Sequence, residues 1–501
     1  MFSGLRVIWI ILSHRLDRLV LGAWCAPSSW LMPLRLSAKS RHRLKQDRGV
    51  RLALALESLG PVFVKIGQVL SMRRDIFPED IVAAMTRLQD KVEGYDGRLA
   101  KLQIEKDFNK NIDDLFVKFD PRPIASASIA QVHAATLHTG EDVVVKVLRP
   151  KIAQLVARDL KIMLRIAKIL TLLLPNSKRL NLVEVVRELK HQLHDELNLR
   201  FEAANATSFK KDFPAEHPLM VPKIYWDYVS KHVMVQERVY GVPILDIDAL
   251  KHQGVNCKYL AKIGLDLFFK QVFENNLFHA DLHGGNIFVN IDDKEKPGFI
   301  CVDFGIMGAM SDQDKYYIAE NLVAFFNRDY RRIAKLHIDS GWVPADVRID
   351  QFEAAIRAVS EPIFSLPLSQ ISFANLFISL LKTMRKFNVE VQPQLILLQK
   401  TLLNVEGLCR LLDPELDLWS TAKPYLENWT KSQLGWRSIK TKMEQNFPIW
   451  VDKFPELPLL VHKFLQPAKI EVVETNYNLL WFGIVFGVGV SFVGFWLYWG
   501  G

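Results

Sequence analysis

The sequence predicts an α+β fold with two lobes, in which a small lobe of strands and helices precedes a larger, mostly helical lobe. Between about residues 115 and 150 the helical spacing of apolar residues gives way to short β-prone runs, two of which are joined by the turn-forming "HTGED". The stretch "HVMVQERVYGVPI" is typical of a strand followed by a Gly/Pro break. From 255 to 470 the pattern is helical, apart from two β-prone runs, "NIFVN" and "GFICVDFG".

Helices are expected on either side of the predicted strands. Residues 48–92 have apolar spacing near 3.6, with Pro78 starting a second helix, and helices return from about 151 to 212. The predicted segments are a basic amphipathic segment (1–47), a helical extension (48–113), the small lobe (114–236), the large lobe (237–470) and an apolar tail (478–499). The four cysteines form no CxxC pair, which favours a reducing compartment and no structural zinc.

The net charge of +9 is concentrated near the N-terminus, where ten basic residues face two acidic ones within the first 51 positions. The stretch "RVIWIILSHRLDRLVLGAW" interleaves basic and apolar residues, a pattern typical of a membrane-surface segment. A helix that packs on its own domain would give the same pattern, so both interpretations stay open. We expect no nucleic-acid partner.

The C-terminal stretch "NLLWFGIVFGVGVSFVGFWLYWG", residues 478–500, has no charged residue and the length of a transmembrane helix. A buried soluble helix is the alternative. Gly483 and Gly487 have the GxxxG spacing that allows close helix contact, and so a possible homodimer through this helix. Aromatic residues lie near its ends, as interfacial anchors do: Trp481, Trp496, Tyr498 and Trp499. The prediction is a tail anchor with the bulk of the protein in the cytoplasm.

The stretch "NNLFHADLHGGNIFV" carries the main chemical signal. Phosphoryl transfer needs a carboxylate near the acceptor oxygen and hard oxygen ligands for magnesium. Asp281 is the candidate catalytic carboxylate, with Asn286 five residues later and Asp303 in "CVDFG" as the candidate metal ligands. The intervening "IFVNIDDKEKPGFICV" predicts the hairpin that such a site requires. In this register the pattern predicts a protein-kinase-like bilobal fold that binds ATP and Mg²⁺.

A zinc pair of His279 and His283 is the competing interpretation of the same stretch. Histidines four apart suit zinc on a helix, but the adjacent glycines disfavour a helix here. We therefore expect His279 to orient Asp281.

Lys146 in "VVVKVLRP" is the candidate ligand of the nucleotide phosphates, although in isolation a strand lysine is more often solvated. Its carboxylate partner is expected in "HDELNLRFEAANA", where Glu196 and Glu202 are the candidates. We favour Glu196 and include it with the catalytic residues.

The loop expected to cover the nucleotide departs from the usual GxGxxG. In its place stands "ASASIAQVHAA", in which alanine and serine keep the backbone accessible but restrict φ. No APE motif or long segment follows the DFG, so little platform remains for a protein substrate. The predicted nucleotide-contacting residues of this loop are Ile124, Ala125, Ser126, Ala127, Ser128, Ile129, Ala130, Gln131 and Val132.

With these motifs, the chain resembles the UbiB family, the atypical protein-kinase-like proteins of ubiquinone biosynthesis, over roughly residues 50 to 310. The family's KxGQ motif stands here as "KIGQ", with Lys65 and Gln68 on one helical face. The resemblance implies that this helical KxGQ extension folds over the active site and that both side chains reach toward the nucleotide pocket. The family's ExD motif appears as "ELN", with Glu196 kept and Asn198 in place of the usual aspartate.

The resemblance also implies an ATP-dependent, membrane-associated activity at the bacterial inner membrane. Its expected partners are membrane lipids or ubiquinone precursors and other ubiquinone-biosynthesis proteins. ATP hydrolysis coupled to the handling of lipid precursors or of a biosynthetic complex is the leading hypothesis. The alternatives are a small-molecule or lipid kinase and a non-catalytic scaffold that binds nucleotide.

Overall fold

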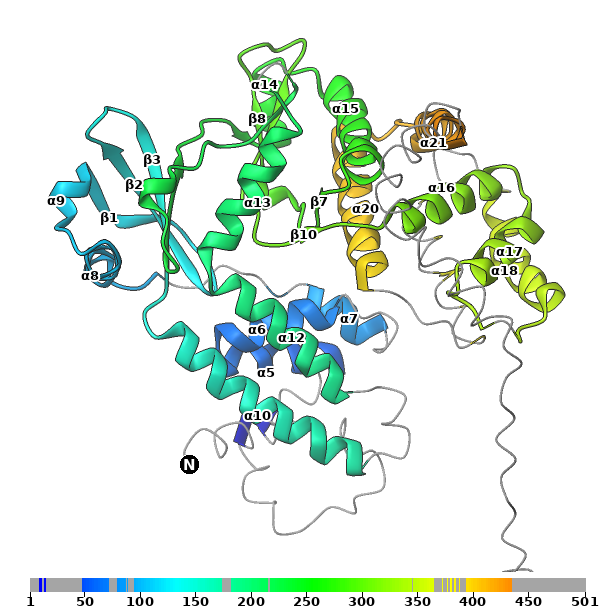
Figure 1. The fold of residues 1–501 in the computed structure, drawn as a ribbon, viewed down its shortest axis with the longest axis horizontal. Coiled ribbons are helices and arrows are strands. Elements are labelled where there is room, and N and C mark those ends of the chain that lie inside the picture. The colour runs from blue at the N-terminus through cyan, green and yellow to red at the C-terminus, as the bar shows by residue number, and fades with distance from the viewer. Residues whose placement is uncertain are drawn as a thin grey trace, which may run out of the picture. The chain divides into compact units, whose positions relative to one another are not determined.

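The structure is a computed structural model (Figure 1), and the chain divides into two compact units, Met1–Lys431 and Ser432–Gly501. The predicted C-terminal span at 478–499 lies outside the described residues, as does most of the basic segment 1–47. Within the described part, no helix is both long and apolar enough to cross a bilayer. The structure describes residues 9–10, 13–14, 47–71, 79–86, 88, 94–173, 182–214, 217–344, 346–364, 372, 376, 379–380, 383, 387 and 393–434.

Three short helices, which pack on one another, come first: α5 (Arg48–Leu59), α6 (Pro61–Ser71) and α7 (Glu79–Thr86). Gly60 ends α5 with a φ of +118°, a conformation that favours glycine, and α6 begins at the next residue. Arg48 at the start of α5 forms an ion pair with Asp80 in α7 (2.6 Å). The start of α7 at Glu79, one residue after Pro78, is where the sequence predicts it.

A four-stranded antiparallel sheet forms the core of the small lobe. Its strands are β1 (Phe116–Ser126), β2 (Ala130–Leu137), β3 (Asp142–Leu148) and β5 (Val233–Glu237), in that order. The alternating residues Val143, Val145 and Val147 share a buried apolar cluster with α8 (Gly97–Phe108), which covers one face with α9 (Ile112–Leu115). Because successive side chains on a strand point to opposite faces, Lys146 points away from α8.

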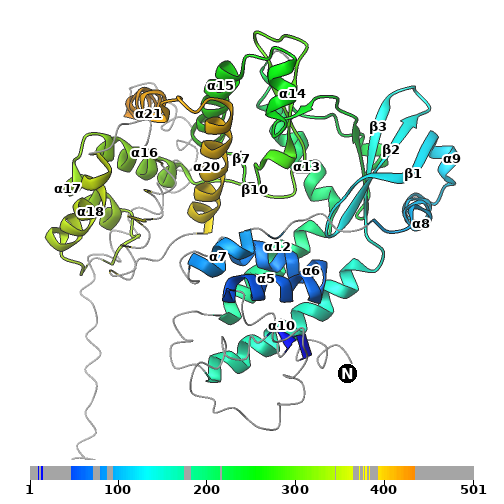
Figure 2. The same cartoon turned by 180° about the vertical axis from the view of Figure 1, so that it is seen from behind.

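Three helices connect the sheet to the rest of the chain: α10 (Ile152–Leu173), α12 (Leu182–Glu196) and α13 (Leu199–Lys211). Helix α10 packs along α12 and also contacts α6 (Figures 1 and 2). Helix α12 ends at Glu196. The side chain of Asn198 then caps α13 by accepting a hydrogen bond from the backbone N–H of Arg200 (3.3 Å). Glu196 and Glu202 therefore lie on two different helices.

The large lobe is mostly helical, as the sequence predicts, and α15 (Cys257–Phe269) packs along α20 (Pro393–Leu412) (Figure 2). A small sheet has the order β4 (Leu219–Met220), β9 (Gly298–Cys301), β8 (Ile287–Asn290), β6 (Val242–Pro243). Strands β8 and β9 form the predicted hairpin, with Ile287 paired to Cys301. The other elements are β7 (Phe278–His279), β10 (Met307–Gly308), α14 (Ile247–His252), α16 (Asp312–Phe326), α17 (Tyr330–Asp339), α18 (Ile349–Phe364), α21 (Leu418–Leu434) and the short turns η3 (Trp226–Tyr228), η4 (Lys270–Glu274) and η5 (Gly284–Asn286).

Candidate active site

Lys146 lies at the centre of a cluster of buried charges. From β3, its Nζ is 2.7 and 2.9 Å from the two carboxylate oxygens of Glu202 in α13, and 3.2 Å from Oδ1 of Asp303. Burial opposes the charge of this lysine, but Asp303 and Glu202 outweigh it and hold the pKa of Lys146 above its usual value. Lys146 is therefore a fixed positive charge between the small lobe and the DFG turn.

The carboxylate partner of Lys146 is Glu202, and the expectation that it would be Glu196 is wrong. Helix α12 ends at Glu196, and the chain changes direction before α13, which packs against β5 beside β3. Glu202 lies in the first turn of α13 and is directed at the sheet. Burial raises the pKa of Glu202 to about 7, although Lys146 acts in the opposite direction.

Glu196 instead binds Lys65, whose Nζ lies 3.1 Å from Oε1 of Glu196, and both side chains are largely buried. Burial raises the pKa of Glu196, although Lys65 lowers it. The other carboxylate oxygen of Glu196 is buried and has no hydrogen-bond partner in the described part of the chain. Lys65 also lowers the pKa of Asp281 and of Asp303, so helix α6 contributes a cation close to three carboxylates. The backbone of Gln68 continues the same helix, but its side chain lies outside the described part.

His279 is buried and orients the loop that follows it. Its Nδ1 accepts from the backbone N–H of Asp281 (3.2 Å), so its Nε2 is the nitrogen that donates, to the carbonyl of Val302 (3.3 Å). Burial lowers the pKa of His279, which keeps the ring neutral. The Nδ1 of His283 accepts from the backbone N–H of Gly285 (3.1 Å) instead. The two rings thus serve separate backbone contacts, and among the described residues no group of three or more His, Cys, Asp or Glu side chains is arranged to hold a metal.

Asp281 has a partner that the sequence did not suggest. Lys400, on α20, places its Nζ 2.6 Å from Oδ1 of Asp281. Burial alone would raise the pKa of Asp281. Lys400, and after it Lys65, outweigh burial and lower this pKa, so the carboxylate stays ionised. Asn286 donates from its side-chain nitrogen to the backbone carbonyl of Asp281 (3.2 Å), so its amide oxygen is the atom available to a metal.

Asp303 adopts a φ of +64°, which is uncommon for a residue other than glycine, at the turn after β9. Burial would raise the pKa of Asp303, but Lys146 and Lys65 hold it well below its usual range. The next residue, Phe304, is buried with its ring centroid 5.4 Å from that of Phe209 in α13. Asn205 in α13 donates to the carbonyl of Phe304 (3.0 Å), so the DFG turn is fixed to the helix that carries Glu202.

The alanine-rich loop is a tight turn between the end of β1 at Ser126 and the start of β2 at Ala130. Arg149 supports it, since its guanidinium donates to the carbonyl of Ala127 (3.0 Å) and to Oγ of Ser126 (2.9 Å). Val132 pairs with Lys146 across β2 and β3, so the two share a face of the sheet.

Gln131 differs from the expectation that it contacts nucleotide. Its side chain is fully buried, accepts from the backbone N–H of Tyr95 (2.8 Å) and donates to the carbonyl of Tyr95 (3.0 Å). Gln131 therefore anchors β2 to the segment before α8.

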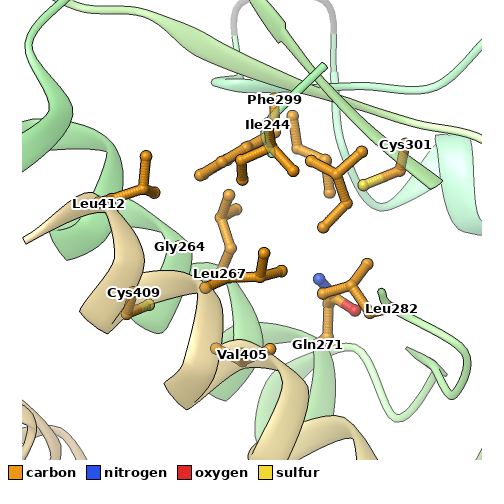
Figure 3. A pocket seen from close by; sticks show the side chains of 13 residues that line it. Ile244, Gly264, Leu267, Gln271, Leu282, Phe299, Cys301, Val405, Cys409 and Leu412 are labelled. Carbon is orange, nitrogen blue, oxygen red and sulfur yellow. The ribbon is translucent and has the colours of Figure 1, made fainter. Parts of the chain in front are cut away.

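A cavity of about 40 Å³ lies behind the catalytic loop, between α15, α20 and the β8–β9 hairpin (Figure 3). Leu282 and Cys301, each close in sequence to a site carboxylate, line it together with Val405, Cys409 and Leu412 from α20. Its lining is almost entirely apolar, and the amide of Gln271 is engaged by the backbone N–H of His279 (3.2 Å). The cavity is too small for a nucleotide, and it lies between helix α20 and the hairpin that precedes Asp303.

The arrangement has the components that bind a magnesium–nucleotide complex. Lys146 can take the phosphates, the amide oxygen of Asn286 and the carboxylate of Asp303 are hard oxygen ligands suited to Mg²⁺, and Asp281 can accept a proton. A bound Mg²⁺ would supply charge neutralisation on the phosphates.

Comparisons with known proteins address the family of this chain. Residues 87–337 match the ABC1 atypical kinase-like domain, and residues 356–417 match the UbiB helical domain. Two relatives are named "Probable protein kinase UbiB", one from Sodalis glossinidius (strain morsitans) and one from Providencia stuartii. They are 48% and 49% identical to this chain. Each alignment spans 474 residues and covers 92% of this chain and 86% of the relative. The chain belongs to the UbiB family.

A solved structure shares the fold. The complex of Rv3197 with erythromycin from Mycobacterium tuberculosis aligns with a TM-score of 0.50 at 23% identity, over 74% of this chain and 93% of that one. The protein-kinase-like, mixed helix and sheet fold expected from the motifs is thus shown for this UbiB family member.

Four of the site residues named from the sequence come together in this UbiB family chain, and two contacts of the cluster differ from the prediction. Lys146, Asp281, Asn286 and Asp303 are brought together by β3, the loop after β7 and the turn after β9. The sequence offers Glu202 as the less favoured partner of Lys146, and it does not predict a role for Lys400. A lysine amid apolar residues in "LILLQKTLL" was the available signal for Lys400.

Proposed function

We propose that this UbiB family protein binds Mg-ATP at the described cluster and cleaves the terminal phosphate, supporting ubiquinone biosynthesis as a membrane-anchored ATPase or atypical kinase. In this mechanism Lys146 holds the α- and β-phosphates, while Asn286 and Asp303 hold Mg²⁺. Asp281 takes the proton of the acceptor oxygen.

One observation supports this proposal most strongly. The Nζ of Lys146 lies 3.2 Å from Asp303, and these two residues are 157 positions apart in the chain. A cation for phosphate next to a carboxylate for magnesium is the pairing that phosphoryl transfer requires, and folding has brought both to one place.

A hydrolytic role is favoured by the position of the N-terminal helices. Lys65 reaches Glu196 within the charge cluster, so helix α6 occupies space beside the site that a large substrate would otherwise use. Water or a small acceptor is compatible with such a site. Coupling of ATP hydrolysis to the handling of lipid precursors or of a biosynthetic complex at the bacterial inner membrane follows as the proposed role, supported by the charge-free stretch 478–499 and by the names of the related proteins.

The test combines quinone profiling with ATP turnover. A strain that lacks the protein is rescued with wild type, Asp303→Asn or Lys65→Ala, and the full-length proteins are assayed in detergent. We expect Asp303→Asn to abolish both turnover and ubiquinone production because it removes a charged metal ligand. Asp346→Asn, at an exposed aspartate outside the site, is the matched control and should behave as wild type.

The outcome separates the alternatives. Normal quinone levels with Asp303→Asn would contradict a catalytic function. A non-catalytic scaffold predicts instead that Asp281→Asn preserves quinone levels while Lys146→Ala disrupts them together with nucleotide binding.

A small-molecule or lipid kinase is the second candidate. Helix α16 begins at Asp312, only nine positions after Asp303, which leaves no extended platform for a protein substrate in this part of the chain. Label transferred from γ-labelled ATP to an extracted lipid or added small molecule, rather than released as inorganic phosphate, would favour this candidate.

A further inference from the structure

Helix α20 brings a cation to the catalytic carboxylate from a distant part of the chain. Lys400 lies 119 positions after Asp281, and its Nζ is 2.6 Å from Oδ1 of that residue. The helix is held in position by α15, along which it packs, and Sγ of Cys409 donates to the backbone carbonyl of Ala261 in α15 (3.4 Å). The contact therefore belongs to a well-packed element.

Besides Lys65, which pairs with Glu196, two cations each contact one of the two site aspartates. Lys146 contacts Asp303, on the side where the α- and β-phosphates and magnesium are held in a kinase-like site. Lys400 contacts Asp281, on the side where the acceptor oxygen gives up its proton. In a kinase-like site the γ-phosphoryl group moves from the phosphate side to the acceptor side, and in this chain that movement would bring it toward Lys400.

The catalytic loop offers no cation of its own for that group. Residues 279–286, "HADLHGGN", contain no lysine or arginine. The transferred phosphoryl group carries its charge on three equatorial oxygens and gains most from a fixed donor in a water-poor site. An ammonium group has three N–H bonds, and the side chain of Lys400 remains 25% exposed, so it can reach a ligand while it contacts Asp281.

We propose that Lys400 is a catalytic residue that binds the γ-phosphoryl group of Mg-ATP beside Asp281, an inference that rests on the proposed function. During transfer, the bond between the γ-phosphorus and the β,γ-bridging oxygen breaks, and its electron pair leaves with ADP. The acceptor oxygen bonds to phosphorus, and its proton goes to the carboxylate of Asp281. Lys400 neutralises charge on the equatorial oxygens and keeps its own protons.

The role assigned to Lys400 also connects the two matched regions of the chain. Lys400 lies within residues 356–417, which match the UbiB helical domain, whereas Asp281 lies within the kinase-like match at 87–337. The helical domain thus completes the catalytic site.

The test measures nucleotide binding and turnover separately in the full-length protein. Wild type, Lys400→Met and Lys400→Arg are titrated with Mg-AMP-PNP, which has a γ-phosphate, and with Mg-ADP, which lacks one. Lys423→Met is the matched control, because this lysine is on α21 and pairs with Glu427 (3.8 Å). Mg-ADP affinity also reports whether each variant is folded.

We expect Lys400→Met to weaken Mg-AMP-PNP about tenfold, as loss of one charged hydrogen bond does, and to leave Mg-ADP affinity nearly unchanged. ATP turnover should fall about 10²- to 10³-fold, the usual cost of removing one preorganised donor, and Lys400→Arg should recover part of it. Lys423→Met should match wild type in both measurements.

Equal losses for the two nucleotides, or no loss for either, would overturn the assignment of Lys400. The binding measurements test the assignment of Lys400 even if the wild type shows no ATP turnover. A wild type without ATP turnover, or an Asp303→Asn variant with full activity, would overturn only the proposed function. A wild type that binds neither nucleotide overturns both.

Discussion

Replacing Glu202 by glutamine tests which carboxylate positions Lys146. The change keeps the size of the side chain and removes its charge. In the wild type the two Glu202 oxygens accept hydrogen bonds of 2.7 and 2.9 Å from Lys146, and both side chains are mostly buried. Without that charge, Asp303 at 3.2 Å becomes the strongest partner of Lys146, so the lysine turns from its phosphate-binding position toward the metal ligand.

The expected size of the effect follows from this geometry. A hydrogen bond to a charged group contributes about 1.5–3 kcal/mol, which corresponds to a change of roughly 10- to 150-fold in a dissociation constant. We therefore expect Glu202→Gln to weaken Mg-ADP binding by about that factor at pH 8. Because burial raises the pKa of Glu202 to about 7, the wild-type carboxylate is mostly protonated at pH 6, and the difference between the two proteins should shrink there.

The assay is calorimetric titration of the full-length protein with Mg-ADP at pH 8 and pH 6. Glu196→Gln is the matched control, since it removes the same charge from a glutamate that pairs with Lys65. Its effect on Mg-ADP affinity should be smaller than that of Glu202→Gln. A larger loss with Glu196→Gln at pH 8, or no loss with Glu202→Gln, would refute the assigned pairing.

Three further predictions concern stability. Burial lowers the pKa of His337 from 6.5 to about 4, so the unfolded chain binds more protons between these pH values, and the free energy of unfolding should fall by up to roughly 3 kcal/mol as the pH drops from 6.5 to 4. Urea unfolding at pH 7 and pH 5 should show a steeper pH dependence for wild type than for His337→Gln, and equal dependence would count against the prediction. Gly97→Ala should lower the melting temperature, because an added Cβ would run into the backbone carbonyl of Pro121, and an unchanged melt would show that α8 can move away. Gly407→Ala should stabilise by about 1 kcal/mol, because it replaces a helical glycine where an added Cβ meets nothing within 4 Å, and a lower melting temperature would contradict this.

The sequence was most informative where local pattern determines side-chain direction. Alternation in "DVVVKVL" is enough to separate Lys146 from the valines that face α8. Asp281 and Asn286 precede a short hairpin and Asp303 follows it, so the hairpin brings the three residues close together. Strands β8 and β9 form that hairpin. These contacts depend on periods of two residues and on short loops.

The sequence was least informative where a helix end or a distant helix decides the contact. Glu196 and Glu202 both lie in segments that the sequence predicts to be helical. The chain ends one helix after Glu196 and begins the next at the N-cap Asn198, and this change of direction turns Glu202 toward Lys146. Lys400 reaches Asp281 through packing of α20 on α15, and its apolar surroundings in the sequence indicate a buried lysine but not its partner. Gln131 lies in the alanine-rich motif, yet the partner that buries it is the backbone of Tyr95, 36 positions earlier.

The most direct test of the central claim is the position of a manganese ion in crystals of the protein grown with Mn-AMP-PNP, located by its anomalous scattering. We expect the ion between the amide oxygen of Asn286 and the carboxylate of Asp303, with the phosphates of the nucleotide against Lys146. A nucleotide bound elsewhere, with no ion at Asn286 and Asp303, would contradict a shared phosphoryl-transfer site.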